Sequence, residues 1–288
     1  MTLTVNARAI TLTVGDQSTA FTGSAVSVTN TFSPTTGTLV SPNVISGLTY
    51  TYTASGYNST TAPTAAGTYT ITGSNAVFSN GIAANYTITY ATGTLTITGA
   101  TQSISFTSTA PLSAKVAGAT YAVSATGGAS GNAVTFTSTT TNVCTVSTAT
   151  VSFVGVGQCI IAANQASTSN YAAATQVTQA FTVTKGDPSL SSFADVSKTF
   201  GDSPFTVIAP SVAGSLPGTF AYASATTSVI SISSTTLTVV AAGTSVITAT
   251  FTPDDTTNYN IVTITMTVTV NARAITLTVG DQSTAFTG

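Results

Sequence analysis

The sequence repeats itself at a fixed distance of 265 residues, and this repetition constrains the fold more than any other feature. Residues 4–23 read TVNARAITLTVGDQSTAFTG, and residues 269–288 are identical to them. The match extends back to Met1, and the only difference is Leu3, which the second copy replaces by Val. Such a period predicts a tandem array, seen here as one 265-residue unit followed by the start of the next. The alternative is an artificially duplicated end, and the Leu/Val difference favours natural drift between repeats.

A shorter period of about 86 residues lies inside the unit. Residues 143–146 align with residues 229–232, and Gly157 aligns with Gly243. A weaker upstream copy contains Gly67 at the matching place. An Asn-Tyr pair follows each copy, and its tyrosines are Tyr86, Tyr171 and Tyr259. The unit is therefore predicted to hold three domains of about 85–100 residues, the size of a small β-sandwich.

Apolar and polar residues alternate along many segments, for example residues 9–14 and 262–268. This period of two, rich in β-branched residues, predicts strands with one face in a core. No segment has a convincing helical period. We expect an all-β chain: a tandem array of three Ig-like β-sandwich domains per unit, with a β-grasp-like variant as the alternative for the first. The expected domains are residues 1–99, 100–186 and 187–270, and residues 271–288 begin the next repeat.

The composition excludes most chemistry. Only 4% of residues are charged, all seven acids are Asp, and the chain contains neither His nor Trp. Without His there is no Ser-His-Asp or Cys-His pair, and two Cys are too few for the usual zinc sites. Five cations spread along the chain do not make a nucleic-acid surface. No apolar run approaches the roughly 18 residues of a membrane span. We expect no enzyme, no cofactor, no nucleic-acid partner and no membrane insertion in this segment.

Cys144 and Cys159 are the only two cysteines. Residues 230 and 245 occupy their positions in the third domain, and Ile230 is in phase with Ile232, which indicates an inward-facing strand position. We predict an intradomain disulfide and hence an oxidising compartment outside the cytoplasm. The alternative is a pair of reduced, buried thiols that act as small hydrophobic residues.

Two further patterns are candidate sites. Asp254 and Asp255 lie in a loop and are weak candidates for Ca²⁺, although a solvated turn is the favoured interpretation because a calcium site needs more oxygen ligands. Tyr86, Tyr171 and Tyr259 could form carbohydrate platforms. A structural, corner-type role is favoured for all three: each tyrosine precedes the last strand, and its hydroxyl is expected to bond to the backbone.

Several motifs resemble families of bacterial surface proteins. Residues 5–98 are similar to MBG-type repeats, and the motifs that carry this are residues 7–14, 67–71, 85–88 and 93–97. Residues 101–185 and 187–270 resemble bacterial Ig-like (Big-type) domains; the motifs are residues 153–157 with the paired Cys, and residues 198–205. The resemblance implies a large secreted or cell-anchored protein, located outside the cell or on the bacterial surface and used as a stalk, adhesin or extracellular fibre.

Thr and Ser make up 101 of the 288 residues and supply most outward strand positions. Low net charge favours association, and charges that normally block strand pairing at sheet edges are scarce. The expected partners are other copies of the repeat, in tandem and also laterally. The expected role is a non-enzymatic structural repeat of a giant adhesin or filament. The alternative is an adhesion module that binds a glycan or a protein.

Overall fold

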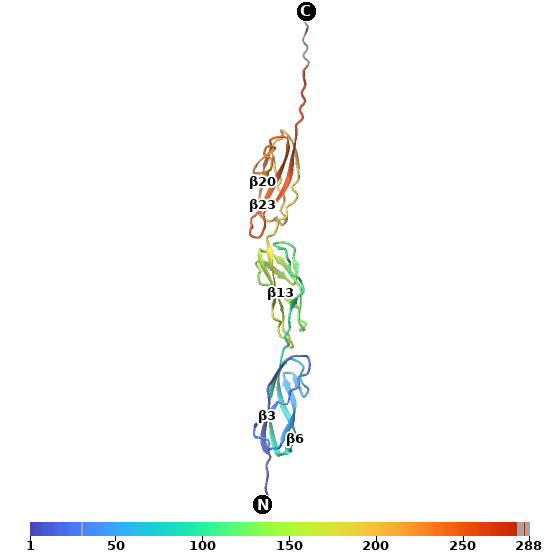
Figure 1. Ribbon diagram of the computed structural model, residues 1–288, viewed down its shortest axis with the longest axis vertical. Coiled ribbons are helices and arrows are strands. Elements are labelled where there is room, and N and C mark those ends of the chain that lie inside the picture. Colours follow the sequence, from blue (N-terminus) through green and yellow to red (C-terminus); the bar gives the residue numbers. More distant parts are fainter. Residues whose placement is uncertain (30, 281–284, 286–288) are drawn as a thin grey trace.

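The structure, a computed structural model, describes residues 1–29, 31–280 and 285. Three all-β domains follow one another along the long axis (Figure 1). Within the described residues, the helical structure consists of two 3₁₀ turns, η1 (Ala83–Asn85) and η2 (Ala213–Ser215). The described residues include no helix with the length and hydropathy of a membrane span.

The first domain is built from two sheets with the strand orders β3-β1-β7 and β2-β8-β6-β4-β5. The strands of this domain are β1 (Arg8–Val14), β2 (Gln17–Ala20), β3 (Phe32–Thr36), β4 (Val44–Ala54), β5 (Tyr57–Ser59), β6 (Gly67–Asn80), β7 (Tyr86–Ala91) and β8 (Gly93–Thr98). In the described part of this domain only η1 is helical, and two neighbouring core clusters fill the space between the sheets. It is therefore a sandwich of two sheets.

The second domain has one sheet of order β10-β17-β16-β13, a second of order β11-β15-β14, and the short pair β12-β9. Its strands are β9 (Ser105–Phe106), β10 (Ala114–Lys115), β11 (Tyr121–Ala122), β12 (Ala125–Thr126), β13 (Val134–Ser138), β14 (Cys144–Ser147), β15 (Thr150–Phe153), β16 (Gly157–Gln165) and β17 (Val177–Thr184). One core cluster lies between the sheets and contains both cysteines.

The third domain repeats this plan with the sheets β18-β24-β23-β20 and β19-β22-β21. Its strands are β18 (Val196–Thr199), β19 (Phe205–Thr206), β20 (Gly218–Ser224), β21 (Ile230–Ser233), β22 (Thr236–Val239), β23 (Gly243–Pro253) and β24 (Val262–Asn271). The four-stranded and three-stranded sheets of the second and third domains have matching strand orders, which agrees with the period of 86 residues found in the sequence; the pair β12-β9 occurs in the second domain.

The alternation of apolar and polar residues determines which face of each strand enters the core. Along β24, Met266, Val268 and Val270 are buried at 4% exposure or less, while the threonines between them lie on the other face. Each burial of a β-branched or Met side chain contributes roughly 1.5–3 kcal/mol relative to exposure. The fold is thus held by apolar contacts between sheets, with hydroxyl groups rather than charges on the outer faces.

Replacing Ile247 by Ala should destabilise the third domain by about 2–5 kcal/mol, because this fully buried side chain would leave a cavity between the sheets. The neighbouring Val246 is 42% exposed, so Val246→Ala is the matched control and should cost much less. Urea unfolding of both variants measures the difference. Equal losses would show that the two faces of β23 are not distinguished by burial.

Candidate functional site

The acidic and thiol side chains of the described residues do not gather into a group that could hold a metal ion. No group of three or more His, Cys, Asp or Glu side chains comes together among the described residues. Asp255 is already engaged: its Oδ1 accepts the backbone N–H groups of Thr257 and Asn258, and its Oδ2 accepts the Asn258 side-chain amide at 2.8 Å. These bonds, first of all that from the Asn258 side chain, hold the pKa of Asp255 below its usual value. Asp255 thus orients Asn258.

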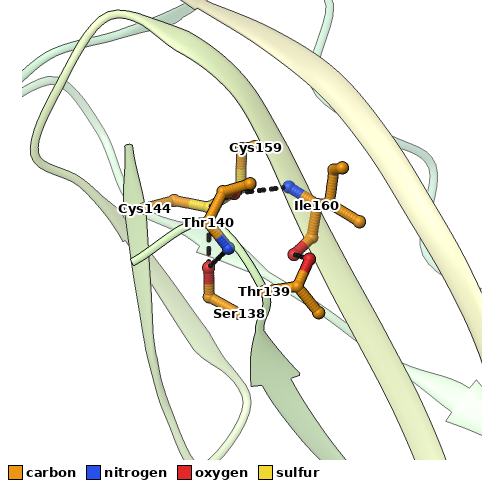
Figure 2. The surroundings of a disulfide bond; sticks show 6 residues. All are labelled: Ser138, Thr139, Thr140, Cys144, Cys159 and Ile160. Carbon is orange, nitrogen blue, oxygen red and sulfur yellow. Dashed lines mark hydrogen bonds between the residues drawn. A yellow bond between two sulfur atoms is a disulfide. The ribbon is translucent and has the colours of Figure 1, made fainter. Parts of the chain in front are cut away.

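The two cysteines form a disulfide that joins the two sheets of the second domain (Figure 2). Cys144 begins β14 and Cys159 lies in β16, both are fully buried, and their Cα atoms are 5.6 Å apart. The turn before β14 packs beside the bond, where Thr140 Oγ1 accepts the Ile160 N–H at 3.0 Å. Ser138 Oγ lies 3.4 Å from the sulfur of Cys144. The disulfide is therefore part of the core.

The third domain fills the same place without sulfur. Ile230 and Ser245, at the positions of the two cysteines, are both buried. The Ser245 hydroxyl is satisfied by Ser224 Oγ at 2.8 Å and by the N–H of Thr226 at 3.0 Å. Hydrogen bonds can therefore replace the covalent link in this fold, which makes the disulfide a local stabiliser of one domain.

A different set of contacts lies at the junction between the first and second domains. Asn170 Oδ1 accepts the backbone N–H of Ala66 at 2.9 Å, although the two residues are 104 positions apart in sequence. Tyr171 forms an isolated parallel bridge with Ala100, just beyond the end of β8. The Tyr171 ring also meets Phe21 edge to face, with centroids 5.5 Å apart. One Asn-Tyr pair thus holds the two domains by a polar bond, a backbone bridge and an aromatic contact.

The junction between the second and third domains uses the same elements. Asn258 Oδ1 accepts the backbone N–H of Val156 at 2.9 Å, and Tyr259 forms the parallel bridge with Gly186. The Tyr259 ring packs against the core cluster of the second domain. A β-carbon at Gly186 would lie 3.2 Å from this ring and 2.4 Å from the carbonyl oxygen of Val116. Glycine is thus the residue that permits this close approach.

Charged residues reinforce this second junction. Lys115 Nζ lies 2.5 Å from Asp187 Oδ2, and the Asn260 side-chain amide donates to Asp187 Oδ1 at 2.6 Å. Lys185 Nζ donates to the carbonyl oxygen of Thr256 at 2.6 Å. The hydrogen bond from Lys115, followed by that from Asn260, lowers the pKa of Asp187. Both partners of the ion pair are half exposed, so the pair orients the domains more than it stabilises them.

The three tyrosines singled out in the sequence have two different placements. Tyr86 is buried in its own domain, where its hydroxyl accepts the Val40 N–H at 2.9 Å and the Asn43 side-chain amide at 2.7 Å. That is the hydroxyl-to-backbone bond expected of a corner. Tyr171 and Tyr259 instead lie at the domain junctions. The residues that sequence reasoning missed are Asn170 and Asn258, whose recurrence before Tyr was the available signal.

Comparison with known proteins gives no family. No protein-family description matches the sequence, and no curated protein is similar to it. Among solved structures, Drosophila N-cadherin EC1-3 has 8% identity over 90% of this chain and 98% of its own, with a TM-score of 0.30. Domains 4 and 5 of the S-layer protein SbsC have 16% identity over 59% of this chain and 98% of their own, with a TM-score of 0.25. The insect immune protein hemolin has 10% identity over 72% and 56%, with a TM-score of 0.32. Such distant likenesses carry no information on what this chain binds.

Replacing Cys144 by Ile and Cys159 by Ser, as in the third domain, should destabilise the second domain by up to roughly 3 kcal/mol. A disulfide that closes a loop of 15 residues restricts the unfolded chain by about that amount. Urea unfolding with and without dithiothreitol measures it. The reductant should weaken the unmodified second domain, leave the double variant unchanged and leave the third domain unchanged in both. An unmodified chain insensitive to reduction would contradict this.

Acid should loosen the junction between the second and third domains. Because the folded-state pKa of Asp187 is lowered, the ion pair with Lys115 is fully present above the unfolded-state value near 3.9. It is lost only as the pH falls below that value and through the folded-state pKa. NMR titration of the Lys115 and Asn260 side-chain signals follows the loss. An Asp187→Asn variant should remove the transition, and a transition near neutral pH would contradict the assignment.

Proposed function

We propose that this chain is a non-enzymatic structural repeat of a large bacterial surface adhesin or extracellular filament, and that it serves as a stiff stalk. The observation that carries the proposal is the joint that occurs twice in one unit. At both junctions an Asn side chain from one domain accepts a backbone N–H of the domain before it. Short connections with several contacts leave little freedom for hinge motion. The unit is then divided at about residues 99, 186 and 270.

The surface chemistry supports a location outside the cell. The disulfide between Cys144 and Cys159 persists in an oxidising compartment, and outside the cell the chain must tolerate changes of pH and salt. The outer strand faces carry Thr and Ser, and only 12 of the 288 residues are Lys, Arg or Asp. Hydroxyl groups do not titrate near neutral pH, so the stability of the folded chain should depend only weakly on pH and salt.

Lateral association is part of the same proposal. Strand β20 lies at the edge of its sheet, pairs on one side with β23, and contains no charged residue. Uncharged edge strands offer unpaired backbone groups to other chains, and a net charge of −2 gives little repulsion between copies. Neighbouring arrays are therefore suited to contact each other side by side.

A second candidate function, a binding module for a glycan or a protein, is favoured by one observation. A cleft of about 560 Å³ in the third domain lies beside Phe193, Phe205 and Val207. Ile208 at this cleft is 87% exposed, and Lys198 Nζ lies 4.7 Å from the centroid of the Phe205 ring. The lining also holds Asp195 and several serines, and an apolar cleft with a few polar groups is typical of small ligand sites.

Small-angle X-ray scattering of this chain, with electron microscopy of the native full-length material, tests the stalk. We expect the scattering of a straight, elongated particle and thin rods in the micrographs. The double variant Asn170→Ala and Asn258→Ala should broaden the distribution of shapes because both interdomain bonds are lost. Asn58→Ala, at an exposed position in β5, is the control. Scattering from bent or collapsed unmodified chains would overturn the stalk, and rods packed into ordered fibres would establish the lateral contact.

A further inference from the structure

The two interdomain joints share one donor position. At the first joint the N–H that binds the Asn belongs to Ala66, and at the second it belongs to Val156. Each donor immediately precedes a glycine, Gly67 or Gly157, with a positive φ of 158° or 142°. These glycines occupy the same place in the internal repeat and begin the long strands β6 and β16. The donor N–H therefore lies at the same position of the fold at both joints.

At both joints the same number of residues separates the last strand of one domain from the bridge to the Tyr of the next domain. Strand β8 ends at Thr98, and the residue two positions later forms the parallel bridge with Tyr171. Strand β17 ends at Thr184, and the residue two positions later forms the bridge with Tyr259. In both cases the chain leaves one domain and, after one intervening residue, pairs with the Tyr of the next.

The start of the first domain shows that the same spacing applies where a third domain is followed by a first domain. Strand β24 ends at Asn271, and two positions later stands Arg273, which is the counterpart of Arg8 in the 265-residue repeat. Arg8 pairs in parallel with Tyr86. The identity of the two copies thus implies that, two positions after the last strand of a third domain, the chain pairs with the Tyr of the following first domain. The other two joints have this same spacing.

The far end of the third domain presents the matching donor. The N–H groups of Val240 and Ala241 both point to the carbonyl oxygen of Val229, as those of Val154 and Gly155 point to that of Val143 in the second domain. The next amide in the third domain is that of Ala242, which precedes Gly243, with a φ of 145°. Ala242 is exposed, and its position corresponds to that of Val156.

The near end of the first domain presents the matching acceptor. Asn85 is exposed and precedes Tyr86, as Asn170 and Asn258 precede their tyrosines. We propose that Ala242 N–H of one unit donates to Asn85 Oδ1 of the next unit, so that successive units are joined by the same bond as the domains within a unit. This inference rests on the proposed tandem array and names its unit-to-unit contact.

Burial supports the continuity of the chain across this joint. Ile275, Leu277 and Val279 are 78–90% exposed, whereas their counterparts in the first domain, Ile10, Leu12 and Val14, are at most 2% exposed. The same residues therefore enter a core once the remainder of a first domain surrounds them. A single residue, Ala272, then lies between β24 and the next β1, counting from the end of β24 and the start of β1.

The two arginines of the chain, Arg8 and Arg273, stand at equivalent positions of successive repeats. Each contacts the domain on one side of the joint. Arg8 Nη2 donates to Thr38 Oγ1 of the first domain at 2.9 Å. Arg273 Nη1 lies 2.8 Å from where a β-carbon of Gly201 in the third domain would be. Because both are the same residue of the repeat, one guanidinium can contact both domains at once. The aromatic part of this joint differs, because Tyr86 points into its own core.

A chain of two units, in which residues 1–265 precede the present sequence, tests the assignment. Only the first unit carries ¹⁵N, so hydrogen-exchange NMR observes its Ala242 amide without overlap from the Ala242 amide of the second unit. We expect this amide to exchange about five- to tenfold more slowly than the same amide in the 288-residue chain, as one hydrogen bond would cause. Asn85→Ala in the second unit should abolish the protection, and Asn85→Asp, which keeps an acceptor oxygen, should retain it. Asn58→Ala is the matched control.

The two proposals fail in different ways. An Ala242 amide that exchanges equally fast in the one-unit and two-unit chains overturns the joint. If X-ray scattering of the same two-unit chain still shows a straight particle, the stalk stands without this bond. A bent particle with a protected Ala242 amide would overturn the stalk and leave the joint in place.

Discussion

The structure depends on how each domain ends. The last strand of every domain is held in the core by alternating apolar side chains, so its direction is fixed when it leaves the sandwich. The backbone groups just beyond that strand must then be satisfied by the following domain or by water. The bridges of Ala100 with Tyr171 and of Gly186 with Tyr259 satisfy them with protein. The orientation of one domain is in this way passed to the next.

Much of the fold could be predicted from the sequence because it follows from local periodicity. The alternation along residues 262–268 specified both a strand and its buried face, and Met266 and Val268 are indeed buried. The disulfide was also predictable, because the counterpart of Cys144 in the third domain is an inward-facing Ile230. For the disulfide, internal repetition served as a substitute for homologous sequences.

The joints could not be predicted in the same way. Asn170 and Ala66 are 104 residues apart and Asn258 and Val156 are 102 apart, and none of these four residues carries a charge. A backbone amide has no side-chain signature, so the donor is invisible in the sequence. The Asn-Tyr pattern was visible, and the Tyr86 hydroxyl accepts a backbone N–H as a corner tyrosine would. Tyr171 finds Phe21 of the neighbouring domain instead, a contact that only the assembled chain defines.

The pairing of the strands near the two ends of each domain has a mechanical consequence. Strand β2 lies parallel to β8, β10 to β17, and β18 to β24, and in each pair the first strand comes early in its domain and the second comes last. Tension along the chain pulls the two members of such a pair in opposite directions along their length. Their hydrogen bonds, which run across the strands, are then loaded together in shear instead of opening one after another. Each domain is thereby built to resist pulling in the direction in which the chain extends.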